Sequence, residues 1–188
     1  MEPSWVPTPV CNALKRNLSF CLIRLSGIYQ ANRRKRRNIV KVLHVVSSLN
    51  VGGAERFVID LAYEQRNHSG WDVDVLSMGQ QGEPLETELR EQDICMHFAS
   101  SIGELRKLIP QFDVVHIHSS HCLLRILLAS LFFWASKIVY TRHNERVHTS
   151  IKWRITYALA RLRLHKMIFV AEKAQSNYLL TYPGFKKK

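Results

Sequence analysis

Two histidines follow short apolar segments at points where a strand would end. His118 comes directly after the segment VVHI, and His143 follows the segment KIVYTR. In α/β folds, polar groups at the carboxyl ends of parallel strands commonly contact ligands. An imidazole there can hydrogen-bond a sugar hydroxyl or a phosphate, and it titrates near neutral pH. Arg142 and Arg146 can add positive charge beside a phosphate. The competing interpretation of His143 is a loop histidine that caps a helix.

His116, His118 and His121 together form the pattern H-x-H-x-x-H. The first two lie two residues apart on a strand and share a face, and such a histidine spacing can hold a metal ion. However, no carboxylate follows closely, and Asp113 stands at the opposite end of the strand. We therefore favour an arrangement without metal, in which His118 ends its strand at the carboxyl edge and another histidine packs inside.

A glycine pair separates an apolar segment from an amphipathic one in KVLHVVSSLNVGGAERFVIDLA, residues 41–62. The order predicts a buried strand, a tight loop at Gly52 and Gly53, and a helix that starts near Ala54. Glycines let a backbone turn sharply and approach a ligand closely. The free N–H groups and the dipole of the helix N-terminus favour an anion. The loop is therefore either a phosphate or sugar site or a simple connection.

Other chemical patterns are absent from the sequence. There is no G-x-G-x-x-G fingerprint and no P-loop motif. No local motif suggests a Ser/His/Asp or Cys/His set, and paired carboxylates at a workable spacing are lacking. Glu55 at the helix start is explained by its favourable interaction with the helix dipole. Ser47 and Ser48 either donate hydrogen bonds or close the turn. The sequence indicates a binding surface more clearly than a catalytic centre.

Alternating strand and helix patterns must position these side chains. We expect strands at 39–47, 72–77, 94–98, 113–118, 137–141 and 167–171. We expect helices at 54–67, 83–91, 102–109, 121–134, 151–164 and 172–180. This alternation predicts an α/β fold: a Rossmann-like parallel sheet with helices on both faces and right-handed crossovers.

The chain has 188 residues and a net charge of +12, which by itself resembles a nucleic-acid binder. The charge lies at the two ends, because residues 1–38 carry +7, residues 186–188 carry +3 and residues 39–185 only +2. We therefore expect no nucleic-acid partner. The four cysteines show no CxxC spacing and no signal peptide precedes them, which favours a reducing cytoplasmic location.

Residues 1–38 form a basic leader that differs from the rest of the chain. Apolar residues recur at helical spacing over 14–28, and the basic run RRKRR follows at 33–37. An amphipathic helix beside a basic cluster suits an anionic membrane surface, which predicts peripheral contact through residues 14–37. The alternatives are a solvated leader or upstream sequence included by a wrong start codon. The longest apolar run, 122–135, is too short to span a bilayer.

Four segments together resemble the amino-terminal domain of family 4 glycosyltransferases, which have the two-domain GT-B architecture. These are VLHVVSSLNVGGAERFVIDLA (42–62), DVVHIHSSH (113–121), VYTRHNE (139–145) and FVAEKAQSNYL (169–179). They follow the family's order at its approximate spacings, and the resemblance covers residues 39–185. The family transfers a sugar from a nucleotide-sugar to an acceptor, usually without a metal or other cofactor.

The resemblance implies roles for particular residues. The glycine loop lies near the donor's diphosphate, His143 near the transferred sugar, and His118 matches a frequent histidine at the end of the fourth strand. His143 is the candidate catalytic residue. The candidate substrate-binding residues are Gly52, Gly53, His118, Thr141, Arg142 and His143.

The second domain of this family holds the nucleotide-sugar through a Lys, an Arg and an E-x7-E motif, and we find none of these in residues 1–188. We therefore expect the acceptor-side half of a transferase, completed by a partner chain that carries the donor domain. The alternatives are a non-catalytic truncated remnant and an unrelated α/β nucleotide-binding module. Relatives suggest bacterial cell-surface polysaccharide or lipopolysaccharide synthesis on a sugar or lipid-linked acceptor, at the inner face of the cell membrane.

Overall fold

The structure is a computed structural model that describes residues 39–131 and 134–185. The chain divides into two units, Met1–Asn38 and Ile39–Lys188, and all that follows concerns the second. The expected amphipathic helix at 14–28, the basic run at 33–37 and the terminal lysines lie outside the described residues. The membrane contact expected of residues 14–37 therefore stays a prediction.

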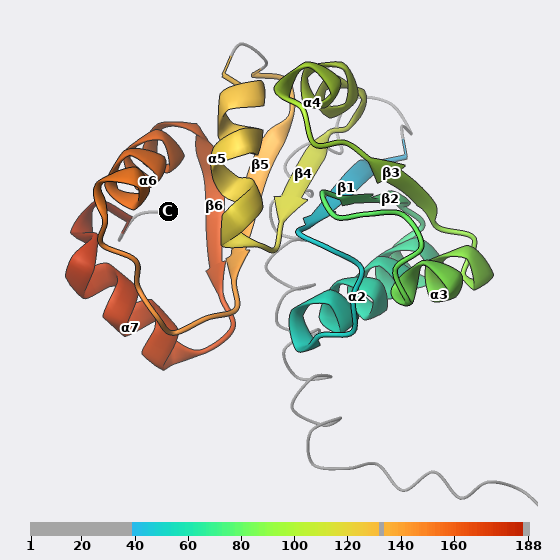
Figure 1. Cartoon of the computed structure of the whole chain (residues 1–188), viewed down its shortest axis with the longest axis horizontal. Helices are drawn as coiled ribbons and strands as arrows, with labels where there is room; N and C mark the ends of the chain where they lie inside the picture. The colour runs from blue at the N-terminus through green and yellow to red at the C-terminus, as the bar shows by residue number, and fades with distance from the viewer. Residues whose placement is uncertain (1–38, 132–133, 186–188) are drawn as a thin grey trace, which may run out of the picture. The chain divides into compact units, whose positions relative to one another are not determined.

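The described residues build a parallel sheet of six strands in the order β3-β2-β1-β4-β5-β6 (Figure 1). The strands are β1 (Lys41–Val46), β2 (Asp72–Ser77), β3 (Cys95–Phe98), β4 (Val114–Ile117), β5 (Lys137–Arg142) and β6 (Leu164–Phe169). The expected strands coincide with these except at β6. This order is that of a Rossmann fold, and it confirms the predicted fold class.

Helices connect successive strands, as the alternating pattern predicts. They are α2 (Gly53–Ser69), α3 (Leu85–Glu91), α4 (Ile102–Leu108), α5 (Ser120–Ala129), α6 (Ile151–Arg163) and α7 (Glu172–Thr181), with short 3₁₀ turns η1 (Ile109–Gln111) and η2 (Pro183–Phe185). Helix α5 ends at Ala129, earlier than expected, and the Ser130 hydroxyl donates to the Leu127 carbonyl just after its last residue.

The sixth strand begins three residues earlier than the expected segment 167–171. Helix α6 ends at Arg163, whose guanidinium donates to the carbonyls of Ser130 and Ser136 and so fixes the turn. Leu164 then pairs with Ile138 and is buried, whereas the exposed His165 interrupts the apolar pattern. The strand pairing therefore starts before the apolar run that suggested it.

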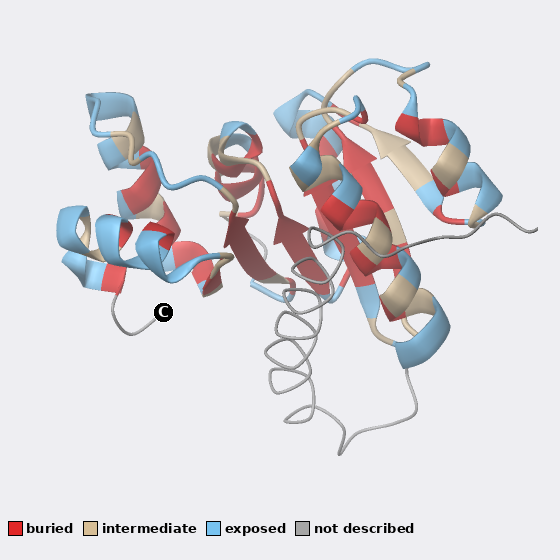
Figure 2. Cartoon of the chain, turned by 90° about the horizontal axis from the view of Figure 1, so that it is seen from below, coloured by how far each residue is buried: buried red, intermediate tan, exposed pale blue. Residues whose placement is uncertain are grey.

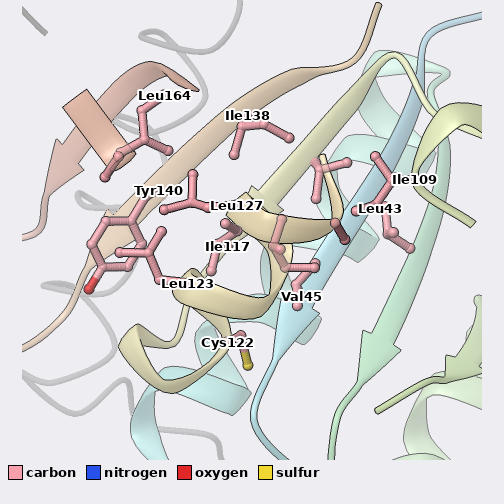
Figure 3. Packing of buried hydrophobic residues seen from close by; sticks show 14 of the residues in the cluster. Leu43, Val45, Ile109, Ile117, Cys122, Leu123, Leu127, Ile138, Tyr140 and Leu164 are labelled. Carbon is pink, nitrogen blue, oxygen red and sulfur yellow. The ribbon is translucent and has the colours of Figure 1, made fainter. Parts of the chain in front are cut away.

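An apolar core fills one face of the sheet, and helix α5 covers its centre (Figure 3). Leu43 and Val45 of β1 and Ile117 of β4 point toward Leu123 and Leu127 of α5. Burial concentrates along the strands and the inner sides of the helices, while the outer sides are exposed (Figure 2). Because side chains alternate along a strand, the residues between these apolar ones face the opposite side.

Helix α2 covers that opposite side next to β1. Phe57, Leu61 and Gln65 recur every four residues on its buried stripe. His44 of β1 faces this helix, because its imidazole contacts the Gln65 side chain. His44 also pairs in register with His116 of β4, so two imidazoles lie side by side under α2.

Strands β1 and β4 are neighbours, although their connections leave toward opposite edges of the sheet. Such a topological switch point opens a crevice at the carboxyl ends of the two strands, where ligands of α/β proteins bind. The loops after β1, β4 and β5 meet there (Figure 1). Within the described part of the chain, no helix has the length and apolar character needed to cross a membrane.

Candidate functional site

A pocket of about 200 Å³ opens at the switch point. Ser47 after β1, His118 to His121 after β4, and Arg142 to Asn144 at the end of β5 line it, together with Ala54 and Glu55 in the first turn of α2. The segments after β1, β4 and β5, from which the candidate binding residues were predicted, therefore converge on one cavity. Its lining is mainly polar side chains and helix-terminal backbone, which suits a hydroxylated or anionic ligand.

His118 and His143 meet at this pocket, as their positions after neighbouring strands suggested. His118 Nδ1 lies 3.4 Å from His143 Nε2, and their ring centroids are 5.7 Å apart. The Phe57 ring from α2 lies edge-on to His143 at 5.3 Å. His143 is partly buried and His118 is buried, so His143 stands closer to the solvent side. The two imidazoles form one wall of the pocket.

A third imidazole connects this wall to the interior. His44 Nδ1 lies 2.9 Å from His118 Nε2, and His44 Nε2 lies 2.8 Å from the Gln65 side-chain oxygen Oε1. Both His44 and Gln65 are fully buried. A continuous row of polar contacts therefore runs from helix α2 through β1 to the pocket.

These imidazoles are neutral at neutral pH. Burial lowers the pKa of His44 to about 4, although the hydrogen bond with Gln65 opposes this in part. Burial also lowers the pKa of His143 to about 4. The pKa of His118 and that of His116 fall well below the ordinary value, first through burial and then through neighbouring histidines. The pocket wall therefore offers neutral hydrogen-bonding groups and no histidine charge.

Three of these histidines also satisfy the spatial requirement for metal ligands. Atoms of His44, His116 and His118 lie within 4.8 Å of one another. His121 does not belong to this group, so the H-x-H-x-x-H spacing does not describe it. Two nitrogens on one tetrahedral zinc, each about 2.0–2.1 Å from the ion, lie about 3.3 Å apart. The 2.9 Å between His44 Nδ1 and His118 Nε2 instead matches a hydrogen bond.

Arg142 stands behind the pocket with much of its hydrogen-bonding capacity used by the protein. Its guanidinium donates to the Tyr157 hydroxyl at 3.0 Å and to the Arg146 carbonyl, and it lies over the Tyr178 ring. It is 2% exposed. Among the described residues, its Nε has no hydrogen-bond partner. Arg142 therefore contributes positive charge to the pocket, with fewer free donors than an exposed arginine would offer.

Thr141 lies below the pocket and does not line it. Its hydroxyl Oγ1 is 2.7 Å from His116 Nε2, and both residues are fully buried. The hydroxyl that the resemblance suggested for substrate therefore contacts a core histidine. His116 itself packs inside the protein, as expected, and its Nδ1 has no hydrogen-bond partner within residues 39–131 and 134–185.

Gly52 and Gly53 directly precede the pocket-lining start of α2, but the turn does not require glycine. Gly52 has φ −154° and ψ 159°, an extended conformation that any residue adopts, and Gly53 is the first helical residue. The expectation that glycine allows a sharp turn is therefore wrong here. A Cβ added to Gly53 meets no atom within 4 Å. The open space over Gly53 leaves room for a ligand, whereas a Cβ on Gly52 would meet the Glu55 carboxylate.

His44 and Gln65 were not among the candidates from the sequence. Each is a polar residue at a position where an apolar one is expected: His44 interrupts the strand KVLHVV, and Gln65 follows Phe57 and Leu61 on the apolar stripe of a helix. A buried polar residue requires a partner. That requirement is the signal that would have identified both.

Comparison with known proteins gives a family and a fold. The family profile described as Glycosyltransferase Family 4 matches residues 51–185. A search of curated proteins finds no match. The fold is similar to that of Anabaena HepE in complex with UDP-glucose, with a TM-score of 0.63 and 19% identity over 74% of this chain. It is also similar to a glycosyltransferase from Rickettsia africae, with a TM-score of 0.61 and 24% identity over 76% of this chain. The matches cover 40% and 39% of those two chains, so this chain spans about two fifths of their length.

Proposed function

The chain belongs to Glycosyltransferase Family 4, and on that premise we propose that it forms the acceptor-side wall of a sugar-transfer site. The reaction is transfer of a sugar from a nucleotide-sugar donor to an acceptor hydroxyl. The observation that carries this proposal is the convergence of His118, His143 and the α2 N-terminus on one pocket at the switch point. Family membership removes the alternative of an unrelated nucleotide-binding module.

Each part of the pocket suits one part of a nucleotide-sugar. A neutral imidazole at His143 can hydrogen-bond a sugar hydroxyl without attracting a competing anion. The free N–H groups at the start of α2 can donate hydrogen bonds to diphosphate oxygens, and the open space at Gly53 lets a diphosphate approach. Arg142 lends positive charge from behind. We therefore assign the sugar to the histidine wall and the diphosphate to the helix terminus.

The pocket is too small for a whole nucleotide-sugar. Its volume of about 200 Å³ lies below the range of about 300–1,000 Å³ that encloses a drug-sized ligand. We propose that the pocket accommodates one sugar ring and the adjoining phosphate, and not the rest of the nucleotide-sugar. We propose that a donor-binding domain, in this chain's continuation or in a partner chain, closes the opposite side and stabilises the leaving nucleotide.

The acceptor and the location are part of the same proposal. Anabaena HepE was solved in complex with UDP-glucose, which supports a nucleotide-sugar as the donor class. A sugar or lipid-linked acceptor, as in bacterial polysaccharide or lipopolysaccharide synthesis, would agree with membrane contact through residues 14–37. Binding to anionic vesicles, lost on deletion of 1–38, tests that contact; unchanged binding would refute it.

We also propose that transfer requires no metal ion. The 2.9 Å between His44 Nδ1 and His118 Nε2 supports this, because it matches a hydrogen bond and is shorter than the separation of two nitrogens on one zinc ion. Activity that survives a strong chelator agrees with the proposal, and activity restored only by a divalent metal contradicts it.

Release of nucleoside diphosphate from a panel of UDP-, GDP- and ADP-sugars tests the function. The 188-residue chain should show no acceptor-dependent release alone. With a donor-binding domain of a Family 4 glycosyltransferase added, release should appear and should be lost in His143→Ala. Release that is the same in this variant would contradict the assigned site.

A further inference from the structure

Four polar side chains from distant parts of the sequence form one row of contacts that ends in the pocket. Gln65 of α2 contacts His44 of β1 at 2.8 Å, His44 contacts His118 at 2.9 Å, and His118 contacts His143 at 3.4 Å. His44 and His118 each contact their two neighbours through different ring nitrogens. We call this row, Gln65–His44–His118–His143, the histidine chain.

The orientation of the Gln65 amide sets the direction of the hydrogen bonds at the buried end: its Oε1 faces His44, while its Nε2 has no hydrogen-bond partner among the described residues. The Gln65 atom that faces His44 is the carbonyl oxygen Oε1, which has no hydrogen and can only accept. The proton between them must therefore belong to His44 Nε2. A neutral imidazole carries one N–H, so His44 Nδ1 has none and can only accept.

The same reasoning passes outward through the next two contacts. His44 Nδ1 accepts, so His118 Nε2 must donate, and this leaves His118 Nδ1 as an acceptor. His118 Nδ1 then accepts from His143 Nε2. Because His143 Nε2 bears the proton, its other ring nitrogen, Nδ1, is bare.

The geometry points to Gln65, His44 and His118 as positioning residues that hold His143 in its Nε2–H tautomer and so present an unprotonated Nδ1 to the ligand. Gln65 lies far from the pocket and acts only through its neighbours. His143 is the residue that contacts the ligand.

The surroundings of the histidine chain favour a single direction. His44 and Gln65 are fully buried and His118 is 5% exposed, so water does not compete for these atoms. In such a low-dielectric interior each hydrogen bond polarises the next. Backbone contacts also hold the end of α2, because the N–H groups of Gly70 and Trp71 both donate to the Gln65 carbonyl. Burial of the imidazoles disfavours their charged forms. A charged imidazole has two N–H groups, so it could not accept a hydrogen bond from the next member of the histidine chain.

The ligand class follows from the bare Nδ1, and this step rests on the proposed function. A bare imidazole nitrogen accepts a hydrogen bond, so it selects a group with a hydrogen to donate. A sugar hydroxyl has one, whereas a fully ionised phosphate has none. The histidine chain therefore assigns His143 to a hydroxyl of the sugar and not to the diphosphate.

Imidazole ¹⁵N NMR of the full chain at neutral pH tests the inference without any ligand. Protonated and bare ring nitrogens have distinct ¹⁵N shifts, so each tautomer is read directly. We expect His44, His118 and His143 all to show a protonated Nε2 and a bare Nδ1. A protonated Nδ1 on His143, or averaged shifts from two tautomers, would overturn the inference.

A variant of Gln65 separates its acceptor from its packing. Gln65→Met keeps the approximate size but removes the acceptor, so His143 should show averaged nitrogen shifts. Leu61→Val, one turn earlier on the same buried stripe, is the control and should keep the wild-type pattern. A wild-type pattern in Gln65→Met contradicts the inference, as does a loss of the pattern in folded Leu61→Val.

Sugar binding separates this inference from the proposed function. If the tautomers are as expected but no nucleotide-sugar shifts the His143 resonances, the histidine chain stands and the proposed function fails. If nucleotide-sugars bind at His143 but its Nδ1 carries the proton, the function stands and the histidine chain is wrong.

Discussion

His44 Nδ1 lies 2.9 Å from His118 Nε2, although 74 residues separate the two in sequence. The contact joins the interior of β1 to the carboxyl edge of the sheet beside β4. It exists because β1 and β4 pair in parallel with His44 opposite His116, which places His118 one step further toward the edge. The order of strands at the switch point therefore connects a buried residue to the ligand pocket.

Stability should fall in mild acid because His44 is buried in its neutral form. Its pKa is about 4 in the folded chain and near the ordinary 6.5 in the unfolded one. The unfolded state thus binds more protons between these values, so stability is full above about pH 6.5 and declines toward pH 4. The slope is about 1.4 kcal/mol per pH unit for one such histidine.

Denaturant unfolding at pH 7 and pH 5 measures this slope. His44→Gln should reduce the number of protons taken up on unfolding by about one, so the free energy of unfolding should depend less on pH. The control Asn67→Gln, on an exposed position of α2, should keep the wild-type slope. Equal slopes in wild type and His44→Gln would mean that His44 is not held neutral by the fold.

Gly53→Ala should stabilise the fold and weaken ligand binding. The position is helical and has open space around it, so alanine should add about 0.4–1 kcal/mol by restricting the unfolded chain. The same methyl group would obstruct a diphosphate, and affinity for UDP should fall several-fold by calorimetry. Gly103→Ala is the control, because Gly103 also lies in the first turn of a helix with open space. It should gain stability and keep the affinity. If Gly53→Ala binds UDP as wild type does, no ligand approaches there.

Glu55→Gln should strengthen binding of UDP several-fold. Glu55 lines the pocket in the first turn of α2, where its negative charge interacts with the helix dipole and opposes an incoming anion. Neutralising it should cost about 0.3–1 kcal/mol of stability. Glu172→Gln makes the same change in the first turn of α7 and should leave UDP affinity unaltered. Weaker UDP binding in Glu55→Gln would instead give Glu55 a direct role in holding the ligand.

His143→Ala should distinguish the sugar from the nucleotide. If His143 contacts the sugar, the variant should lose affinity for a nucleotide-sugar but bind the free nucleoside diphosphate as before. NMR titrations with UDP-glucose and with UDP compare the two. Equal losses for both ligands would place His143 at the diphosphate and contradict its assignment.

Much of the fold was predictable from local patterns, because buried parallel strands and amphipathic helices have different periodicities. His118 and His143 were likewise found from their positions after apolar runs. The role of Thr141 was not, since only the pairing of β4 with β5 shows that its hydroxyl faces His116. His44 and Gln65 were not identified from the sequence for a similar reason, because their partners lie on elements that only the tertiary fold brings together. The local sequence predicts which segments form strands, whereas the register between strands depends on the whole sheet.

We propose that the pocket at the switch point holds the sugar and diphosphate of a nucleotide-sugar. The most direct test is an NMR titration of the ¹⁵N-labelled chain with a panel of UDP-, GDP- and ADP-sugars, which detects even weak binding. We predict that at least one donor shifts the signals of Gly53, His118 and His143, and that the shifts of His118 vanish in His143→Ala. Shifts confined to residues outside the pocket, or none with any donor at millimolar concentration, would mean that the pocket does not bind a nucleotide-sugar.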